Sequence, residues 1–326
     1  MPSKLKFQYR SDMELLEEVI PQQFDECFGN GTTMYDRTDF ADLNSHKVKA
    51  VHHLTMRDSK LRFGIILGDD GETLSSPFSA PFGGLIPAKN NRHTEPRQVL
   101  MALEALKAYG KERQKQVRIT LPPPFYAPGL VSEQANAMFL IGKLSAMDLN
   151  YHFPIEKMRN YVSCLPSPAN ARNYRRALKY EFEYESAFAL ENRSLFERAY
   201  NVIRQNRDDM GFPLRMTAED MLRTAPIAQT FCVVQSLNGE DITAAIAHTA
   251  VKKGIWQVVY WGDLRQHAKM HPMNVLAPEL FRLAREYGAR IVDIGPSSQH
   301  SIPNYGLCSF KLSLGCEESL KLSFIL

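Results

Sequence analysis

The sequence predicts a mixed α/β protein of the α+β type, with two similar domains that each contain a mixed, mostly antiparallel sheet flanked by helices. Its 326 residues are about twice the length of a typical domain. The two halves repeat one order of predicted elements, and the helices in matching positions end on similar runs, "KAYG" and "REYG". A repeated order of elements indicates an internal duplication.

The first half begins with strand-like runs between residues 48 and 82. The segments "VKAVHHLTM", "KLRFGIIL" and "TLSSPFSAPF" predict an antiparallel meander with a turn at "GDDGE". Val99, Leu103 and Leu106 stand at helical spacing within residues 94–116. The strand "VRITLPPPFY" follows, and its prolines end it.

The second half repeats this order. The runs "QTFCVVQSL", "ITAAIAHTAV" and "IWQVVYWGD" predict strands, Leu276, Leu280 and Leu283 predict a helix, and "ARIVDIGP" predicts a final strand. Between the halves, "SEQANAMFLIGKLSAMDL" and "PSPANARNYRRALKY" predict helices. The Pro-rich "CLPSPAN" between them predicts the boundary, so we expect domains of residues 1–160 and 161–326.

Composition and charge exclude several classes of protein. An apolar fraction of 44% and a charged fraction of 23% are those of an ordinary globular protein. The net charge of +3 is too small to predict binding to DNA or to a membrane surface. The N-terminus lacks the apolar run of a signal peptide, and no segment approaches the ~18 apolar residues of a membrane span. We therefore expect a cytoplasmic protein with no membrane-spanning segment.

The cysteines and short motifs exclude further classes. The five cysteines are widely spaced and never form a CxxC pair, so neither a disulfide framework nor a zinc ribbon is predicted. No GxGxxG follows a strand and no Walker A sequence is present, which argues against dinucleotide binding and P-loop phosphoryl transfer. His267 and His271 stand four residues apart, but the zincin glutamate is missing and Pro272 follows at once. We predict no metal site.

Two other motifs have a simple structural interpretation. "ECFGNG" at residues 26–31 is a poor match to the loop that holds the CoA pyrophosphate in acetyltransferases, and a Gly-Asn-Gly turn is the better interpretation. Cys308 with His300 in one polar loop is the pattern of a cysteine hydrolase, although Cys308 before an apolar segment is typical of a small packed residue.

Five segments together carry a family resemblance. In chain order they are "SPFSAPFGGL", "ITLPPPFY", "NRDDMGFPLRM", "MHPMNVLAPELFRLAREYGARIVDIGPSS" and "PNYGLCSFKLSLG". Their order and spacing resemble the FemABX-like branch of the GNAT (N-acetyltransferase-type) superfamily, whose members carry two tandem GNAT-like domains. The resemblance runs from about residue 30 to the end. It implies that a C-terminal strand, here about residues 318–326, packs back onto the first domain.

The resemblance also implies transfer of an acyl or aminoacyl group to an amine. The donor is then acyl-CoA or aminoacyl-tRNA, used as a substrate with no tightly bound cofactor. The acceptor is an amine-bearing small molecule or a precursor of the cell wall, cell envelope or a polysaccharide. The coiled-coil arm that some members insert for contact with tRNA has no counterpart, because no stretch shows sustained charged heptads.

Candidate catalytic residues follow from matching the family's second domain. The lysine of its Phe-Lys pair, thought to neutralise charge on the donor, matches Lys311 at a predicted helix start. Negative charge develops on the carbonyl oxygen when an amine attacks an ester or thioester, so a lysine in a water-poor cleft stabilises the transition state. Asp293, Tyr305 and His271 are candidates for accepting the amine's proton.

Each catalytic candidate has an alternative interpretation. Lys311 is also a residue that could extend from an apolar helix to solvent. The carboxylate of Asp293 could cap the next turn, and His271 could bound the following helix. Tyr305 is equally a core residue.

Substrate-binding candidates come from both halves. Gly83 and Gly84 allow close approach of the backbone, either to a ligand or to another strand as in a bulge. Arg207 and Arg215 are suited to an anionic acceptor or to salt bridges. Two polar residues of the loop at 297–305 complete the set, and the second is also a turn candidate: Ser297 and Asn304.

The sequence departs from the family pattern at two positions, and the second of them, together with the missing CoA-pyrophosphate loop, favours a second hypothesis. Ile294 replaces the phenylalanine of the family's Asp-Phe-Gly-Gly segment, and Pro296 replaces its second glycine. Proline has no backbone N–H, so that amide cannot bind an oxyanion or phosphate. The alternative to an enzyme is therefore a non-catalytic GNAT-like ligand-binding protein.

Overall fold

The computed structural model describes residues 15–29, 33–91 and 93–326. It divides into two compact units, one of the described residues up to Ser145 with Leu322–Leu326, the other of Ala146–Lys321. The division lies near residue 145 instead of 160 because strand β7 (Lys143–Pro154) enters the second sheet. The prediction of helix up to Leu149 was wrong, since Gly142 has extended backbone angles and ends the helix.

The first unit contains a sheet with the strand order β1-β2-β3-β4-β6, with β5 beside β3. β3 is antiparallel to β2 and β4, and β4 is parallel to β6. The strands are β1 (Leu15–Glu18), β2 (Ala50–Arg57), β3 (Leu61–Asp69), β4 (Thr73–Ser76), β5 (Ile86–Pro87) and β6 (Gln116–Thr120). The helices are α1 (Pro21–Phe28), α2 (Thr38–Asn44), α3 (Pro96–Glu112) and α4 (Pro128–Ile141).

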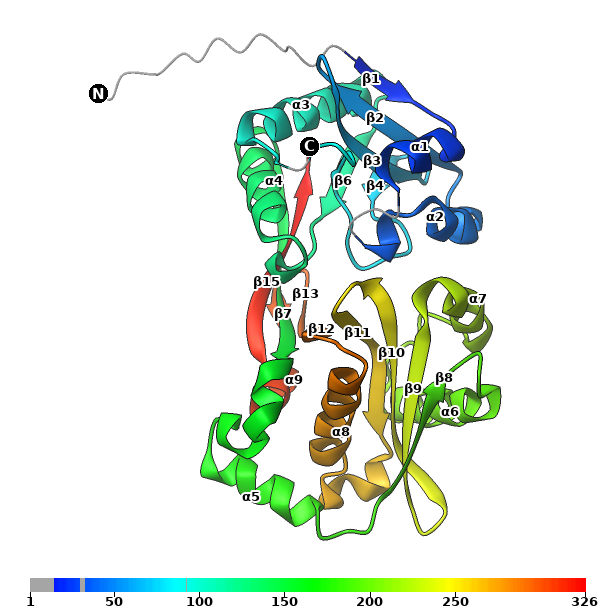
Figure 1. The fold of residues 1–326 in the computed structure, drawn as a ribbon, viewed down its shortest axis with the longest axis vertical. Coiled ribbons are helices and arrows are strands. Elements are labelled where there is room, and N and C mark those ends of the chain that lie inside the picture. The colour runs from blue at the N-terminus through cyan, green and yellow to red at the C-terminus, as the bar shows by residue number, and fades with distance from the viewer. Residues whose placement is uncertain (1–14, 30–32, 92) are drawn as a thin grey trace, which may run out of the picture. The chain divides into compact units, whose positions relative to one another are not determined.

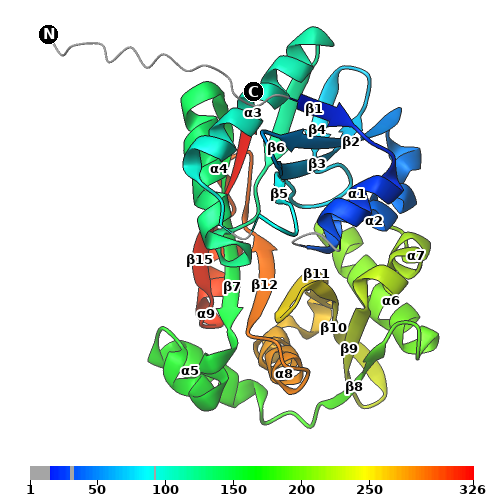
Figure 2. The ribbon, with the colours of Figure 1, turned by 45° about the horizontal axis from the view of Figure 1, so that its top comes forward.

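Helices cover both faces of the first sheet (Figure 2). Ile65 and Ile66 of β3 point to opposite faces because side chains alternate along a strand. Ile65 joins Leu106 of α3 in one buried core, and Ile66 joins Phe24 and Phe28 of α1 in another. The apolar residues predicted at helical spacing in α3 therefore form the helix face that binds the sheet.

The second unit has the strand order β7-β12-β11-β10-β9-β8. β10 is antiparallel to β9 and β11, and β11 is parallel to β12. The strands other than β7 are β8 (Glu183–Phe188), β9 (Thr230–Leu237), β10 (Glu240–Lys252), β11 (Ile255–Asp263), β12 (Ile291–Pro296), β13 (Ser298–Gln299) and β14 (Ile302–Pro303). The helices are α5 (Pro168–Ala177), α6 (Arg193–Met210), α7 (Ala218–Ala228), α8 (Met273–Glu286) and α9 (Tyr305–Ser313).

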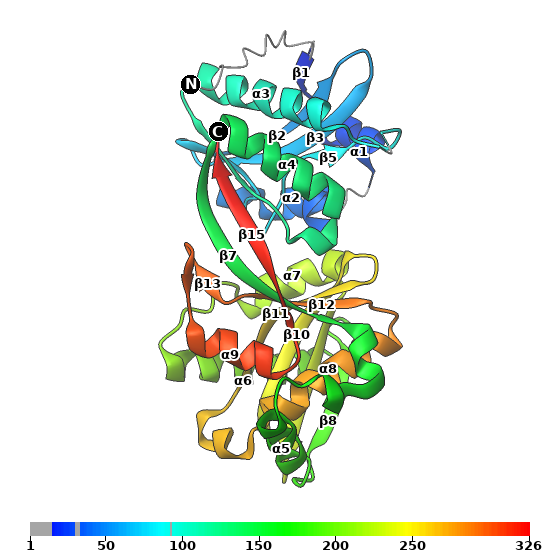
Figure 3. The same ribbon diagram turned by 90° about the vertical axis from the view of Figure 1, so that its left-hand side faces the viewer.

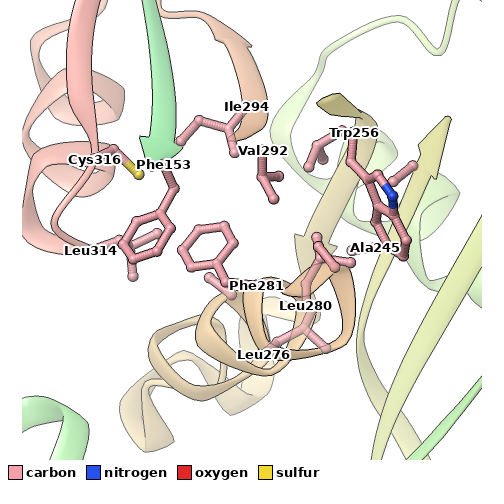
Figure 4. Close-up of a cluster of buried hydrophobic side chains, with 14 of the residues drawn as sticks. Phe153, Ala245, Trp256, Leu276, Leu280, Phe281, Val292, Ile294, Leu314 and Cys316 are labelled. Atoms are coloured by element: carbon pink, nitrogen blue, oxygen red, sulfur yellow. The ribbon is translucent and has the colours of Figure 1, made fainter. Parts of the chain in front are cut away.

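The second sheet is also covered on both faces, with α8 on one side and α6 and α7 on the other (Figure 1). Val233 of β9 packs in the core that contains Phe281 of α8, and its neighbour Val234 packs in the core that contains Phe196 of α6. Figure 4 shows the α8 side, where the rings of Phe153 and Phe281 stack with centroids 4.1 Å apart. Burial of both strand faces explains why β9 reads as a continuous apolar run.

The two units repeat one topology. Each has an antiparallel meander of three strands, a helix, and a strand parallel to the last strand of the meander: β2-β3-β4, α3 and β6 in the first, and β9-β10-β11, α8 and β12 in the second. The predicted fold class of two similar α+β domains is confirmed.

The C-terminal strand β15 (Glu317–Ile325) begins in the second unit and ends in the first. Its last residues, Ser323, Phe324 and Ile325, pair antiparallel with β6. The strand order places β15 beside β7 (Figure 3). None of the helices in the described part of the chain is long and apolar enough to cross a membrane.

Candidate functional site

A cavity of about 660 Å³ opens in the second unit where β11 and β12 diverge. The two strands pair from Ile255 and Ile291 up to Gln257 and Asp293. Beyond that pair the ladder ends, although β11 continues for six more residues. Both strands, together with α6, α8 and α9, supply the cavity walls.

A bulge in β11 lies just beyond the last residue that pairs with β12. Val258 pairs with Ala247 and Tyr260 pairs with Ile246, so Val259 is an extra residue on β11. A bulge bends its strand and re-aims the residues that follow. Here those residues line the cavity, from Val259 to Asp263.

Much of the cavity wall is apolar. Trp261 and Phe310 line it with an edge-to-face contact, their ring centroids 6.0 Å apart. Met210 and Phe212, on either side of the α6 C-terminus, also line it and are 54% and 48% exposed. Exposed apolar side chains beside a cavity of this size are typical of a ligand-binding site.

Arg207 of α6 lines the cavity and is half-buried. Its guanidinium has no hydrogen bond or ion pair with the residues that the structure describes, and burial lowers the pKa of Arg207 from its usual value. A half-buried arginine without a protein partner is suited to binding an anionic group of a ligand.

Asp263 and His271 bring titratable groups to the same cavity. Asp263 ends β11, and burial raises the pKa of its carboxyl above the usual value, opposed by the charge of His267. His271 adopts left-handed backbone angles, with φ of 54°, just before α8. Both residues line the cavity, so either could accept a proton from a bound amine.

The ammonium of Lys311 is enclosed by a backbone loop. Lys311 is only 2% exposed and lies in the last turn of α9. Its Nζ donates hydrogen bonds to the carbonyl oxygens of Ile294, Gly295 and Pro296, at 2.9, 2.8 and 3.0 Å. Burial lowers the pKa of Lys311 to about 8, and the charge of Asp293 opposes that shift. All three ammonium hydrogens are thus bound to the protein.

Asp293 holds the same loop from its other side. Its carboxylate is buried and accepts hydrogen bonds from Asn150 Nδ2 at 2.8 Å, Gln257 Nε2 at 3.1 Å and the backbone N–H of Gly295 at 3.0 Å. Gly295 has a positive φ of 75°. Asp293 and Lys311 therefore fix the conformation of residues 294–296, which form one wall of the cavity.

Comparison with known proteins rests on solved structures. No family model matches the chain, and no curated protein matches its sequence. FemX superposes with a TM-score of 0.63 at 12% identity, over 95% of this chain and 96% of FemX. The C-terminal domain of a putative lysylphosphatidylglycerol synthetase from Agrobacterium fabrum gives 0.59 at 10% identity, over 94% and 92%. A tandem GNAT protein from the clavulanic acid biosynthesis pathway gives 0.53 at 10% identity, over 96% and 98%.

This chain has the tandem GNAT fold. The resemblance to the FemABX-like branch is confirmed at the level of the fold, and identities of 10 to 12% carry no more than that. The second unit corresponds to the second of the two tandem domains, so the cavity lies in that domain.

The tandem GNAT fold brings four of the sequence candidates to one cavity. These are Lys311, His271, Arg207 and Asn304. Asn304 also caps α9, because its Oδ1 accepts a hydrogen bond from the N–H of Leu307 at 3.0 Å. Four residues from three different elements meet although they span about a hundred positions of sequence.

Other candidates of the second unit lie outside this cavity. Asp293 and Ser297 are buried behind it, at 1% and 2% exposure. Tyr305 is 77% exposed and does not line it, and Arg215 is exposed as well. The alternative interpretation of Tyr305 as a core residue is excluded, and that of Asp293 as a turn cap describes its bond to Gly295.

The glycine pair lies in the first unit. Gly83 donates its N–H to Thr120 O at 2.8 Å, and Gly84 donates its N–H to Ser76 Oγ at 3.1 Å. Their close backbone approach is therefore to the chain itself. Cavities beside them hold only about 10 Å³ each.

Neither Cys308, His300 nor the described part of "ECFGNG" lines the cavity. Cys308 is buried, and its thiol donates to Ser297 O at 3.7 Å, as expected of a packed residue. His300 is exposed in the hairpin between β13 and β14. Part of the "ECFGNG" run lies outside the described residues.

Sequence reasoning missed Asp263. Asp263 ends a predicted strand in "VVYWGDLRQ". An aspartate at the end of a strand is also a common turn residue, so its position alone does not mark a site. A polar residue at the carboxyl end of a sheet strand was the signal that could have found it.

Proposed function

We propose that the cavity of the second unit is an acyl-transfer site, where an amine receives an acyl or aminoacyl group. The divergence of β11 and β12 carries this proposal, because it leaves the β12 side of residues 258–263 facing a cavity instead of a strand. Buried backbone groups need hydrogen-bond partners. An extended ligand that contains amides can supply them as an added strand would.

Acyl-CoA is the first donor to test on this reasoning. Its pantetheine arm is an extended chain with two amides, and the cavity of about 660 Å³ has room for that arm and an acyl group. Aminoacyl-tRNA is the second donor to test, because its aminoacyl end alone would enter the cavity. Neither is a tightly bound cofactor.

The proposed reaction is a nucleophilic acyl substitution. The amine nitrogen attacks the carbonyl carbon, a C–N bond forms, and the C–S bond of a thioester or the C–O bond of an ester breaks. The leaving thiolate or alkoxide takes up a proton. The ammonium must first lose a proton, and we assign its acceptance to Asp263, whose raised pKa brings it nearer to that of the amine. His271 is the second candidate for this role.

We assign Arg207 to recognition of an anionic group on the acceptor. A guanidinium without a protein partner would bind a phosphate or carboxylate of the acceptor. One structural neighbour is named as a lysylphosphatidylglycerol synthetase, and so by its name acts on a phospholipid. This supports an anionic amine-bearing precursor of the cell envelope as the acceptor class.

Lys311 and Asp293 act in this scheme as positioning residues. Removing the ammonium by Lys311→Met leaves three carbonyl oxygens and the Asp293 carboxylate without it. Breaking a buried charged contact costs about 3–5 kcal/mol, so we expect a large loss of stability together with loss of binding. Lys321→Met is the matched control, because the described residues offer its ammonium no hydrogen bond and we expect a loss below about 1 kcal/mol.

Calorimetric titration with acetyl-CoA and longer acyl-CoAs tests the function. One-site binding at ligand concentrations 100-fold above Kd should raise the free energy of unfolding by about 2.7 kcal/mol. Arg207→Met should leave donor binding intact and weaken binding of the anionic acceptor. Absence of both heat and thermal stabilisation with every acyl-CoA would contradict the acyl-CoA donor and direct the search to aminoacyl-tRNA.

A non-catalytic binding protein is the second candidate function. It is favoured by Pro296, which has no N–H to stabilise an oxyanion, and by the full commitment of the Lys311 hydrogens to carbonyl groups. Saturable donor binding without turnover on any amine acceptor, in a protein of intact fold, would support this candidate over the enzyme.

A further inference from the structure

A row of polar side chains crosses the second sheet from the cavity to the edge strand. Asp263 of β11 stands opposite Thr243 of β10, Thr243 opposite Gln235 of β9, and Gln235 opposite Tyr184 of β8. Residues directly opposite on neighbouring strands share a face of the sheet. With strands about 4.8 Å apart, the row is about 14 Å long.

The middle of this row is buried and unpaired. Gln235 and Thr243 are both 0% exposed. Within the described residues, neither the amide of Gln235 nor the hydroxyl of Thr243 has a hydrogen-bond partner. Burying such groups unpaired is costly, and native proteins do so rarely. The adjacent row on the same face contains the apolar pair Val233 and Ala245, so apolar side chains suit this layer of the sheet.

The two ends of the row differ in their surroundings. Asp263 lines the cavity, and Tyr184 is 38% exposed on the last strand of the sheet. The row therefore leads from the proposed reaction site to solvent along one face of the sheet. Thr243 can both donate and accept a hydrogen bond, and Gln235 offers two donors and an acceptor, which are the partners that a buried water needs.

We propose that Thr243 and Gln235 position buried water through which Asp263 returns the reaction's proton to solvent at the Tyr184 edge. The proposal rests on the proposed function, in which the ammonium gives a proton to the Asp263 carboxylate. Asp263 then passes a proton to the first water while another proton leaves the far end, so every group of the row returns to its starting state. Thr243 and Gln235 are positioning residues, since neither touches the reacting atoms.

One charged neighbour must be controlled in any test. The charge of His267 opposes the effect of burial on the pKa of the Asp263 carboxyl. His267 Nε2 lies 3.1 Å from Glu240 Oε1, so a substitution of His267 also removes this contact. His267→Gln therefore serves as a background in which each variant of the row is measured again.

The first experiment measures the pKa of Asp263 in the full chain by carbon-13 NMR of labelled aspartate carboxyls. Asp263→Asn assigns the signal. Thr243→Val and Gln235→Met keep side-chain volume and remove the polar groups, and we expect each to raise the Asp263 pKa by about one unit, because the carboxylate loses water-mediated donors. Thr243→Ser, which keeps the hydroxyl, should restore the original pKa.

Thr230→Val is the matched control for the loss of a buried hydroxyl. Thr230 lies on β9 outside the row and pairs with His248 Nδ1 at 3.2 Å. Its loss should lower thermal stability and leave the Asp263 pKa unchanged. An unchanged Asp263 pKa in Thr243→Val or Gln235→Met, with a raised Tm, would overturn the proposal. It would show that these polar atoms are buried without bound water, because apolar replacements would then stabilise the fold. This readout needs no substrate and so is independent of the proposed function.

The second experiment measures turnover in dilute and in concentrated imidazole buffer. Thr243→Val should lower kcat about tenfold in dilute buffer, and added imidazole should restore it, because a small base can take the proton directly from Asp263. A kcat equal to that of the unmodified protein in dilute buffer would overturn the relay even if the Asp263 pKa had shifted. A complete lack of turnover in the unmodified protein would count against the proposed function instead.

Discussion

The two units share a topology but differ in the space beyond their parallel strand pair. In the first unit β4 ends at Ser76, the residue where its pairing with β6 also ends. In the second unit β11 continues to Asp263, six residues past Gln257, its last residue paired with β12. The first arrangement leaves cavities of about 10 Å³ and the second a cavity of about 660 Å³.

The chain itself fills the space in the first unit. Gly83 returns to β6 and donates its N–H to Thr120 O at 2.8 Å, where a neighbouring strand would otherwise bond. Phe82 is 1% exposed and packs against Tyr126 and Tyr35, with ring centroids 4.5 and 5.2 Å away. A local segment thus supplies the hydrogen bonds and the apolar volume that a ligand would supply in the second unit.

The difference teaches that duplication copies a scaffold and not a site. Both halves provide a parallel strand pair after the meander, but the residues that follow the third strand of the meander decide whether the space beside that pair is open. "SSPFSAPFGG" folds back after β4, whereas "WGDLRQHAKM" leads from β11 toward α8. The proposed site therefore belongs to the second unit.

Phe82→Ala tests the filled space of the first unit, and of the variants in this comparison it should lower the free energy of unfolding most. Removing a buried phenylalanine costs about 3–5 kcal/mol of the free energy of unfolding. Phe310→Ala, at the wall of the open cavity, should cost less than about 2 kcal/mol because that ring is only partly buried. Chemical denaturation of both variants checks the comparison, and equal losses would contradict the distinction between a filled and an open space.

Gly84→Ala tests the backbone of the closing segment. Gly84 has φ of +120°, and a Cβ there would lie 2.8 Å from Gln134 Oε1, which already accepts a hydrogen bond from Leu85 N. We expect a loss of about 1–3 kcal/mol. Gly129→Ala is the control, since a Cβ there meets nothing within 4 Å and lies in α4, where alanine should stabilise by up to about 1 kcal/mol. A neutral Gly84→Ala would show that the segment is loosely held.

The fold was largely predictable because most of its strands are apolar runs bounded by turn residues. The runs that became β9, β10 and β11 are apolar and contain β-branched residues, and the turn "NGED" separates the first two, which favours buried strands. The segment that became β7 was misread because "FLIGKLSAMDL" has apolar residues at both helical and strand spacing. Only pairing with β12 decides between the two.

The site was predictable only where a motif marked it. Lys311 was found through the family pattern, and His271 as an imidazole suited to accept the amine's proton. The direction of the Lys311 side chain was not predicted, because three carbonyl groups of another segment hold it. Asp263, Thr243 and Gln235 are brought together by strand register alone. Register depends on tertiary packing, so no local pattern in the sequence reveals it.

Asp263→Asn tests the buried carboxyl through stability. A carboxyl whose pKa is raised in the folded state holds its proton more tightly there than in the unfolded chain, so stability falls as pH rises from about 4 through the folded pKa. The amide removes this cost, and we expect a gain of about 1 kcal/mol at pH 7 that vanishes below pH 4. Denaturation across this pH range checks it, with the exposed Asp209→Asn as a control that should show no gain.

Gly306→Trp should convert the open space into a filled one with the smallest change in stability. Gly306 lines the cavity in the first turn of α9, and a Cβ there meets only Asn304 Oδ1, at 3.5 Å. The indole can therefore enter the cavity with a change in unfolding free energy below about 1 kcal/mol. Acyl-CoA binding should be lost in Gly306→Trp and kept in Gly306→Ala, as measured by titration calorimetry. Equal affinity in both variants would place the donor elsewhere, and the contrast between the two units would then concern packing alone.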